Sequence, residues 1–125
     1  MPMTADGTLK EVDILGKKYK GEALLKRVGQ LIRTAYFAEE DNPEKAFARD
    51  FIWYLWCGKN SPAFDKSKMA TFERYFLTDK ETHKEVKGYY YTLRDREDIY
   101  DMNLDEIRVE GEHRHIINAH VPIKA

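Results

Sequence analysis

The most regular pattern of hydrophobic positions in this chain lies between residues 21 and 39. Apolar residues recur there every three or four positions, with charged residues between them. This spacing places the apolar side chains on one face of an α-helix. The apolar positions are Leu24, Leu25, Val28, Leu31, Ile32, Ala35 and Tyr36. The pattern therefore predicts an amphipathic helix over residues 21–39.

The residues before this helix show a weaker pattern. Residues 8–19 carry short apolar clusters around Val12 and Ile14, and Gly16 interrupts them. Short apolar clusters next to glycine are typical of tight turns between extended strands. The segment is predicted to form either a β-hairpin or an irregular extended stretch.

A second helix is predicted to follow residue 40 and to run to about Trp56. Asp41 or Asn42 can serve as its N-cap, because their side chains accept hydrogen bonds from free backbone N–H groups. Pro43 suits the first turn, where its missing N–H costs no hydrogen bond. Glu44 interacts favourably with the positive end of the helix dipole.

The end of this second helix, residues 51–57, is apolar almost all round, and we expect it to be central to the core. Gly58 should stop the helix, and residues 58–62 should form a loop. Aromatic residues at helical spacing are usually core residues rather than a stacking platform for bases. The aromatic residues assigned to the core are Trp53, Trp56, Phe72, Tyr75 and Phe76.

Two shorter helices, residues 68–79 and 94–107, are predicted from apolar residues at helical intervals. Residues 115–123 differ, because a β-branched run broken by Pro122 is typical of a strand and its exit loop. The predicted fold class is mainly α (α+β): four or so helices, a short N-terminal extended segment and a C-terminal strand. A late, single strand needs a sheet supplied by residues outside this chain.

The composition of the chain argues against two classes of partner, nucleic acids and membranes. The chain has 125 residues with 42% hydrophobic residues, enough for one modest core and one domain. Its 21 basic and 22 acidic residues nearly balance, so no nucleic-acid partner is indicated. The longest apolar run is far shorter than the roughly 20 residues that span a bilayer, so no membrane partner is indicated either. A single cysteine, Cys57, is consistent with a cytoplasmic protein.

Three blocks of sequence carry a resemblance to a known family. They are residues 2–8 (PMTADGT), residues 56–62 (WCGKNSP) together with 69–76 (MATFERYF), and residues 115–122 (HIINAHVP). In this order they resemble class III fructose-1,6-bisphosphatases, which belong to the calcineurin-like metallophosphoesterase superfamily. The resemblance implies an internal fragment of a larger α/β enzyme with a dinuclear Mn²⁺ site. Residues 1–110 would form a helical insertion, and residues 111–125 a strand and loop returning to the catalytic core.

The resemblance also implies an activity for the parent enzyme, a phosphoric monoester hydrolase. It would hydrolyse fructose 1,6-bisphosphate to fructose 6-phosphate and phosphate in gluconeogenesis. The superfamily motifs Asp-x-His, Gly-Asp-x-x-Asp-Arg and Gly-Asn-His do not occur in this sequence. We therefore expect the fragment to be inactive alone and its partner to be the rest of the parent chain. Assembly into a homo-oligomer is left open.

His120 is the residue that the resemblance assigns to the metal site. The family usually reads Asn-Gly-His-x-Pro where this chain has residues 118–122, with Ala119 in place of glycine. Spacing alone favours an ordinary surface or core histidine at a strand end. His113 and His115 also share one face of an extended segment, but a metal role for this pair is the less favoured interpretation.

Four polar residues are candidates for contacts with substrate phosphate: Lys59, Asn60, Ser61 and Arg74. A polar loop after a buried helix can present backbone N–H groups and cations to an anion. The stronger alternative is that the loop residues are ordinary turn residues, that the lysine is solvated, and that the arginine forms an ion pair.

A different class of function is an autonomous helical interaction or regulatory module without catalysis. Residues 89–91 are three consecutive tyrosines, which cannot all be buried on one face, so at least one should be exposed. An exposed apolar patch there would mediate self-association.

Overall fold

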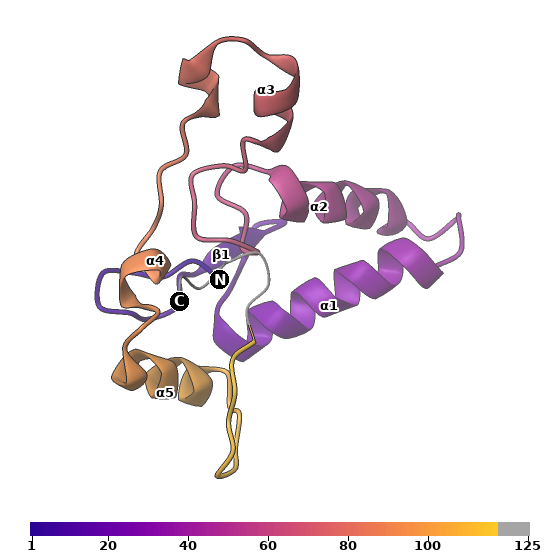
Figure 1. Ribbon diagram of the computed structural model, residues 1–125. Coiled ribbons are helices and arrows are strands. Elements are labelled where there is room, and N and C mark those ends of the chain that lie inside the picture. Colours follow the sequence, from indigo (N-terminus) through magenta and orange to yellow (C-terminus); the bar gives the residue numbers. More distant parts are fainter. Residues whose placement is uncertain (118–125) are drawn as a thin grey trace.

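The computed structural model describes residues 1–117, and these residues are mainly helical with one small sheet (Figure 1). Strands β1 (Val12–Ile14) and β2 (Lys17–Tyr19) pair antiparallel, with Asp13 opposite Lys18. The helices of the described part are α1 (Gly21–Phe37), α2 (Lys45–Cys57), α3 (Thr71–Phe76), α4 (Tyr90–Leu93), α5 (Glu97–Glu106) and the 3₁₀ turn η1 (Lys80–His83).

The hairpin alternative for residues 8–19 is confirmed. Leu15 and Gly16, the two residues between the strands, have φ values of 55° and 77°. Two consecutive residues with positive φ are typical of a tight two-residue hairpin loop. The side chain of Asp13 closes the turn by accepting a hydrogen bond from Gly16 N at 2.8 Å.

The main core lies between α1 and α2, which run antiparallel to each other (Figure 1). The predicted amphipathic helix is confirmed, because Leu24, Leu31 and Ala35 are buried on the side facing α2 and the hairpin. Leu25 and Ile32 are 45% and 44% exposed, and Tyr36, which the pattern also places on the apolar face, is 79% exposed. The buried residues of the cluster are Ile14, Leu24, Leu31, Ala35, Ala48 and Phe51.

A second, smaller core holds the N-terminal residues against α5. It contains Met3, Leu9 and Ile99. Gly7 has a φ of 86°, and a Cβ added there would lie 2.4 Å from Ile99 Cδ1. The side chain of Asn103 donates a hydrogen bond to the Gly7 carbonyl at 3.2 Å. The block of residues 2–8 is therefore fitted closely to α5.

Helix α2 begins later than the sequence predicts. Asn42 acts as a cap, but for a turn that precedes the helix, because its Oδ1 accepts a hydrogen bond from Glu44 N at 2.9 Å. The helix proper starts at Lys45, whose buried ammonium group donates to the Ala38 carbonyl and to Glu40. It ends at Cys57, and Gly58 follows as the C-cap, as predicted.

The prediction that residues 51–57 are central to the core holds for one face of the helix and is wrong for the other. Phe51 is buried, but Trp53 and Trp56 are 58% and 55% exposed. In α3, Tyr75 and Phe76 are 80% and 78% exposed, so their assignment to the core is also wrong. The physical reason is that, within residues 1–117, α1 packs on one face of α2, whereas Trp53 and Trp56 on another face contact Phe72 of the short helix α3.

The later helices are shorter than predicted. The helix expected over residues 68–79 is α3, residues 71–76, because the preceding segment is extended. Lys66 there forms an antiparallel bridge with Lys87, and Ala70 N donates to the Glu85 carboxylate. The helix expected over residues 94–107 is α5, residues 97–106.

The predicted C-terminal strand is not formed over residues 115–117, the part of it that the structure describes. No described strand lies beside these residues to supply hydrogen bonds. The rest of the predicted strand, residues 118–123, lies outside the described residues.

Candidate functional site

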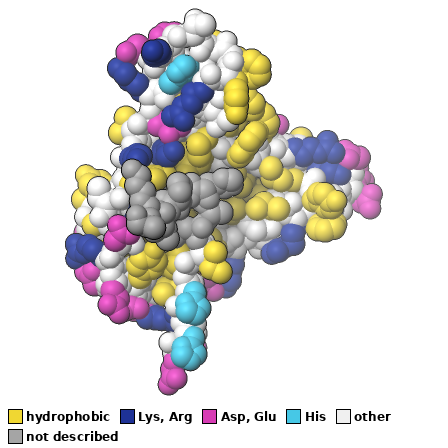
Figure 2. All heavy atoms as spheres, in the orientation of Figure 1, with side chains coloured by type: hydrophobic (Ala, Val, Ile, Leu, Met, Phe, Trp, Pro, Cys, Tyr) yellow, Lys and Arg dark blue, Asp and Glu magenta, His cyan; other side chains and the backbone are white. Residues whose placement is uncertain are grey.

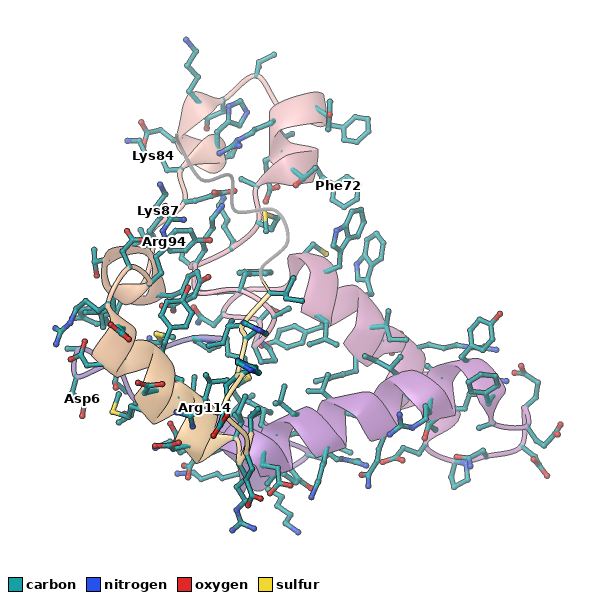
Figure 3. The ribbon with its side chains drawn as sticks, turned by 60° about the horizontal axis from the view of Figure 1, so that its bottom comes forward. Asp6, Phe72, Lys84, Lys87, Arg94 and Arg114 are labelled. Atoms are coloured by element: carbon teal, nitrogen blue, oxygen red, sulfur yellow. The ribbon has the colours of Figure 1, made fainter. Side chains whose placement is uncertain are left out.

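The proposed metal ligand His120 lies outside the described residues. Within residues 1–117, no three His, Cys, Asp or Glu side chains come together as a group that could hold a metal ion. His113 and His115 are exposed, and Arg114 between them forms ion pairs with Asp101 and Asp105 of α5 (Figure 3). The described part of the chain therefore does not build a metal centre from its own side chains.

The loop after α2 places its candidate residues in different environments. Lys59 and Asn60 are exposed, whereas Ser61 is fully buried. The Ser61 hydroxyl donates to the Leu55 carbonyl at 2.7 Å and accepts from Ala63 N at 3.1 Å. Ser61 thus uses its hydroxyl to hold the loop against the end of α2.

Asn60 lies at the edge of a cavity of about 580 Å³. It has a φ of 54°, and its carbonyl accepts a hydrogen bond from the hydroxyl of Tyr54 at 3.2 Å. Burial raises the pKa of this tyrosine, so the hydroxyl keeps its proton and remains a donor. Three lysines also line the cavity: Lys10, Lys66 and Lys87.

Asp65 is the buried carboxylate of this cavity, and sequence reasoning did not single it out. Its Oδ2 accepts a hydrogen bond from Tyr90 N at 2.7 Å, and its carbonyl accepts from Gly88 N at 2.7 Å. Lys10 Nζ lies 4.0 Å from its Oδ1. A Cβ on Gly88 would lie 2.1 Å from Asp65 Oδ1, so only glycine fits there. No local sequence signal marks this aspartate, because its partners are more than twenty residues away.

Arg74 is connected to this cavity through Glu85. Its guanidinium group lies 3.6 Å from Glu85 Oε1, and Lys66 Nζ donates to Glu85 Oε2 at 2.8 Å. Burial of the Glu85 carboxyl opposes its charge, but the hydrogen bonds from Lys66 and Ala70 N lower its pKa overall. Asn60 and Lys66 therefore line the same cavity, and Arg74 is linked to Lys66 through Glu85.

The cavity combines donors for an anion with a carboxylate that repels one. Lysine ammonium groups can donate hydrogen bonds to phosphate oxygens. Lys66 is already paired with Glu85, and Lys87 lies 5.4 Å from the centroid of the Tyr91 ring. Lys59 is not among the residues that line the cavity. Of the four candidate residues, only Asn60 lines it, and Arg74 reaches it through Glu85.

Comparison with known proteins identifies the family. A protein-family model described as Firmicute fructose-1,6-bisphosphatase matches residues 1–125, the whole chain. This chain belongs to that family. The resemblance seen in the three sequence blocks is thereby confirmed.

The curated relatives of this chain are named fructose-1,6-bisphosphatase class 3. One from Phocaeicola vulgatus is 69% identical over 124 residues, which is 99% of this chain and 19% of the relative. One from Bacteroides fragilis is 60% identical, and one from Clostridium botulinum is 48% identical, with the same coverage. The chain therefore spans about 19% of the length of the relatives it matches.

No solved structure matches this fructose-1,6-bisphosphatase family chain. Within residues 1–117, none of the helices has the length and hydrophobicity needed to cross a membrane.

Proposed function

We propose that this chain is a segment of a metal-dependent fructose-1,6-bisphosphate 1-phosphatase. The parent enzyme hydrolyses fructose 1,6-bisphosphate to fructose 6-phosphate and phosphate, in gluconeogenesis and in the cytoplasm. The observation that carries the proposal is the match of the family model to every residue of the chain. The names of the curated relatives support it.

In this proposal, the residues that carry out hydrolysis lie mainly outside this chain. The chain spans 19% of its relatives' length and lacks the superfamily's metal-binding motifs, so we expect no hydrolysis by the chain alone. Residues 1–110 form the helical insertion, and residues 111–125 lead back to the catalytic core. His120 contributes one ligand to a dinuclear Mn²⁺ site whose other ligands come from outside this chain.

The substrate contacts in this proposal come from exposed polar groups. Lys59, Asn60 and Arg74 have side chains that a phosphate can reach, and Arg74 is 57% exposed. A guanidinium group can donate two hydrogen bonds to one phosphate, so Arg74 is the strongest of the three donors. Ser61, with its enclosed hydroxyl, contributes by fixing the loop that presents Asn60.

The direct test exchanges the matching segment of the Phocaeicola vulgatus relative for this chain. Phosphate release from fructose 1,6-bisphosphate is then measured in Mn²⁺ buffer for the exchanged enzyme and for the 125-residue chain. We expect turnover only in the exchanged enzyme. Turnover by the 125-residue chain would mean that it holds a complete site and would contradict the proposal.

The role of His120 is tested by His120→Ala in the exchanged enzyme. Loss of one metal ligand should lower the affinity for manganese and the rate of hydrolysis, each by at least the roughly 10–100-fold that is typical when a group that only orients a ligand is lost. Atomic spectroscopy measures the manganese that stays bound. His113→Ala is the matched control, because His113 is exposed. Equal manganese content and equal rates in the two variants would remove His120 from the metal site.

A second candidate function is an interaction module without catalysis, and the observation that favours it is the exposed Tyr89, at 48%. Its neighbour Tyr91 lies beneath two lysines, with Lys66 Nζ 5.8 Å from the ring centroid. This candidate requires the 125-residue chain to self-associate in light scattering and Tyr89→Lys to abolish that association. A monomeric 125-residue chain contradicts it.

A further inference from the structure

Four aromatic rings of α2 and α3 pack against one another on the surface of the molecule. Phe72 lies between the other three, with ring centroids 5.7 Å from Trp53, 5.5 Å from Trp56 and 6.4 Å from Phe76. Figure 3 shows Phe72 pointing from α3 toward the end of α2. We call these four residues, Trp53, Trp56, Phe72 and Phe76, the aromatic face.

The aromatic face is open to solvent in the described structure. Trp53, Trp56 and Phe76 are 58%, 55% and 78% exposed. Figure 2 shows the hydrophobic side chains gathered over α3 and the end of α2. Single exposed apolar residues are common on protein surfaces, but contiguous apolar patches mark sites of interaction. Because tryptophan is enriched at the buried centres of interfaces, this patch has the composition of a docking site.

The aromatic face continues into a groove that reaches both ends of the described chain. Trp56 lines this groove, of about 830 Å³, together with Ile52 and Met69. Met1 and Ile117, the first and last residues that the structure describes, line the same groove. Both ends of the described residues therefore lie at the groove that Trp56 lines.

The curated relatives show how much polypeptide is available to cover this face. The matched segment is 19% of the relative from Phocaeicola vulgatus, so most of that enzyme lies outside the match and must connect through one or both of its ends. A surface tethered beside its docking site has an effective concentration in the millimolar range, which a second copy of the chain does not reach in dilute solution. The covalently connected occupant is therefore favoured over a second copy.

We propose that the aromatic face is the surface on which the catalytic part of the enzyme packs against this segment. The inference rests on the proposed function, because it takes the chain to be a segment of a larger phosphatase. The occupant is an apolar surface of the enzyme's own remaining chain. The rings then become the anchor that fixes the segment, and with it residues 58–62 and Arg74, relative to the catalytic centre.

The experiment compares oxidative footprints of the 125-residue chain and of the Phocaeicola vulgatus enzyme that carries it in place of its own segment. Hydroxyl radicals modify exposed aromatic rings, and mass spectrometry locates the modified residues. We expect oxidation of the aromatic face to fall about fivefold in the exchanged enzyme, because interface centres are almost fully buried. Tyr36 and Phe37 are the internal control, since they are 79% and 75% exposed at the far end of α1.

Two outcomes overturn the proposal. Equal oxidation of the aromatic face in both proteins would show that the rest of the enzyme does not cover it. Protection that appears in the 125-residue chain alone and grows with its concentration would assign the face to a second copy. The footprint does not depend on hydrolysis, so an inactive exchanged enzyme with a protected face would contradict the proposed function and leave the docking proposal standing.

Two double variants show whether the rings stabilise contacts with the rest of the enzyme or only the fold of the segment itself. Trp53→Ser with Phe72→Ser should lower the melting temperature of the exchanged enzyme by on the order of 3 °C more than that of the 125-residue chain. Tyr36→Ser with Phe37→Ser is the matched control and should show no such difference. Equal losses in the two proteins for the first double variant would mean that the rings only stabilise the segment itself, which overturns the proposal.

Discussion

The α1–α2 pair and the arm formed by α3 and η1 are two helical regions with opposite relations to the core. In the α1–α2 pair, Leu24, Leu31 and Ala48 are at most 1% exposed. In the arm, residues 71–83, neither α3 nor η1 contains a buried residue, and Figure 1 shows the arm standing away from the other helices. Burial of apolar area stabilises the α1–α2 pair. Within residues 1–117, the arm buries too little apolar area to be held in the same way.

Polar contacts hold the arm instead. The ring of His83 has Nε2 at 3.0 Å from the Glu73 carbonyl and 2.9 Å from the Leu77 carbonyl, at the end of α3. Lys68 Nζ donates to the Thr82 carbonyl, which ties η1 to the segment just before α3. Hydrogen bonds of this kind define a geometry but add only about 0.5–1.5 kcal/mol each. The arm is therefore positioned by polar contacts and by the contacts of Phe72 with the two tryptophans of α2, and its apolar rings stay largely exposed.

The largest effect in this comparison is expected from Leu31→Ala. Leu31 is fully buried between α1 and α2, so the substitution removes apolar contacts and leaves a cavity. We expect a loss of about 3 kcal/mol in the free energy of unfolding, measured by chemical denaturation of the 125-residue chain. Ile32→Ala is the matched control, because Ile32 is 44% exposed and should cost well under half as much. Similar losses in both variants would contradict the assignment of the core.

The sequence predicts α1 well, α2 in part and the arm poorly, for a physical reason. Periodicity shows which residues share a helix face, and in α1 that face is the one that packs on α2. In the arm the same spacing identifies Phe72 and Phe76 as neighbours but does not show what covers them. The hairpin and the stop at Gly58 were predictable because glycine and turn residues act locally.

The candidate site was predictable only in part, because its contacts are long-range. Residues 58–62 are a loop, as predicted, but the burial of Ser61 depends on a hydrogen bond to the end of α2. The partners of Asp65, at residues 88 and 90, could not be found from spacing. The assignment of His120 to a metal site stays a prediction.

A second prediction concerns the N-terminal residues, which pack against α5 in the smaller core. Gly7→Ala places a Cβ against Ile99 in a left-handed backbone conformation, and we expect a loss of about 2–3 kcal/mol in the free energy of unfolding. Gly16→Ala is the matched control, because its φ of 77° is also positive but a Cβ there meets nothing within 4 Å. Thermal denaturation of both variants separates the clash from the backbone strain. Equal losses would mean that the contact with α5 contributes nothing.

A third prediction concerns a substitution that should destabilise the arm but not the main core. Glu85→Gln removes the charge that pairs with Lys66 and Arg74 next to the arm. We expect the free energy of local opening, obtained from amide exchange in residues 71–83, to fall by about 1–2 kcal/mol. The same quantity in α1 should stay unchanged. Hydrogen exchange followed by NMR measures both regions at once. Glu81→Gln is the control, because Glu81 is exposed and pairs only with Lys84 among the described residues. Loss of protection throughout the chain would show that the arm is part of the main core.

The same carboxylate gives the arm a pH dependence whose sign follows from its pKa. The folded structure lowers the pKa of Glu85 below its ordinary value of 4.5, so the contribution is fully present above that value. It is lost as the pH falls through the lower pKa of the folded state. Protection factors of residues 71–83 should therefore decrease on acidification below about pH 4.5 in the wild type, and less in Glu85→Gln. The same acid response in both proteins would assign the effect to another group.

The smallest effect is expected from Trp53→Ser in the 125-residue chain, although tryptophan is the largest side chain. Trp53 is 58% exposed, and what it loses is its contact with Phe72 and Trp56. We expect a loss of about 0.5–1 kcal/mol in the free energy of unfolding by chemical denaturation, far below that of Leu31→Ala. A loss equal to that of Leu31→Ala would make the aromatic face a second core of the segment and remove the contrast between the two regions. A small loss is the result that the proposed docking role of these rings requires.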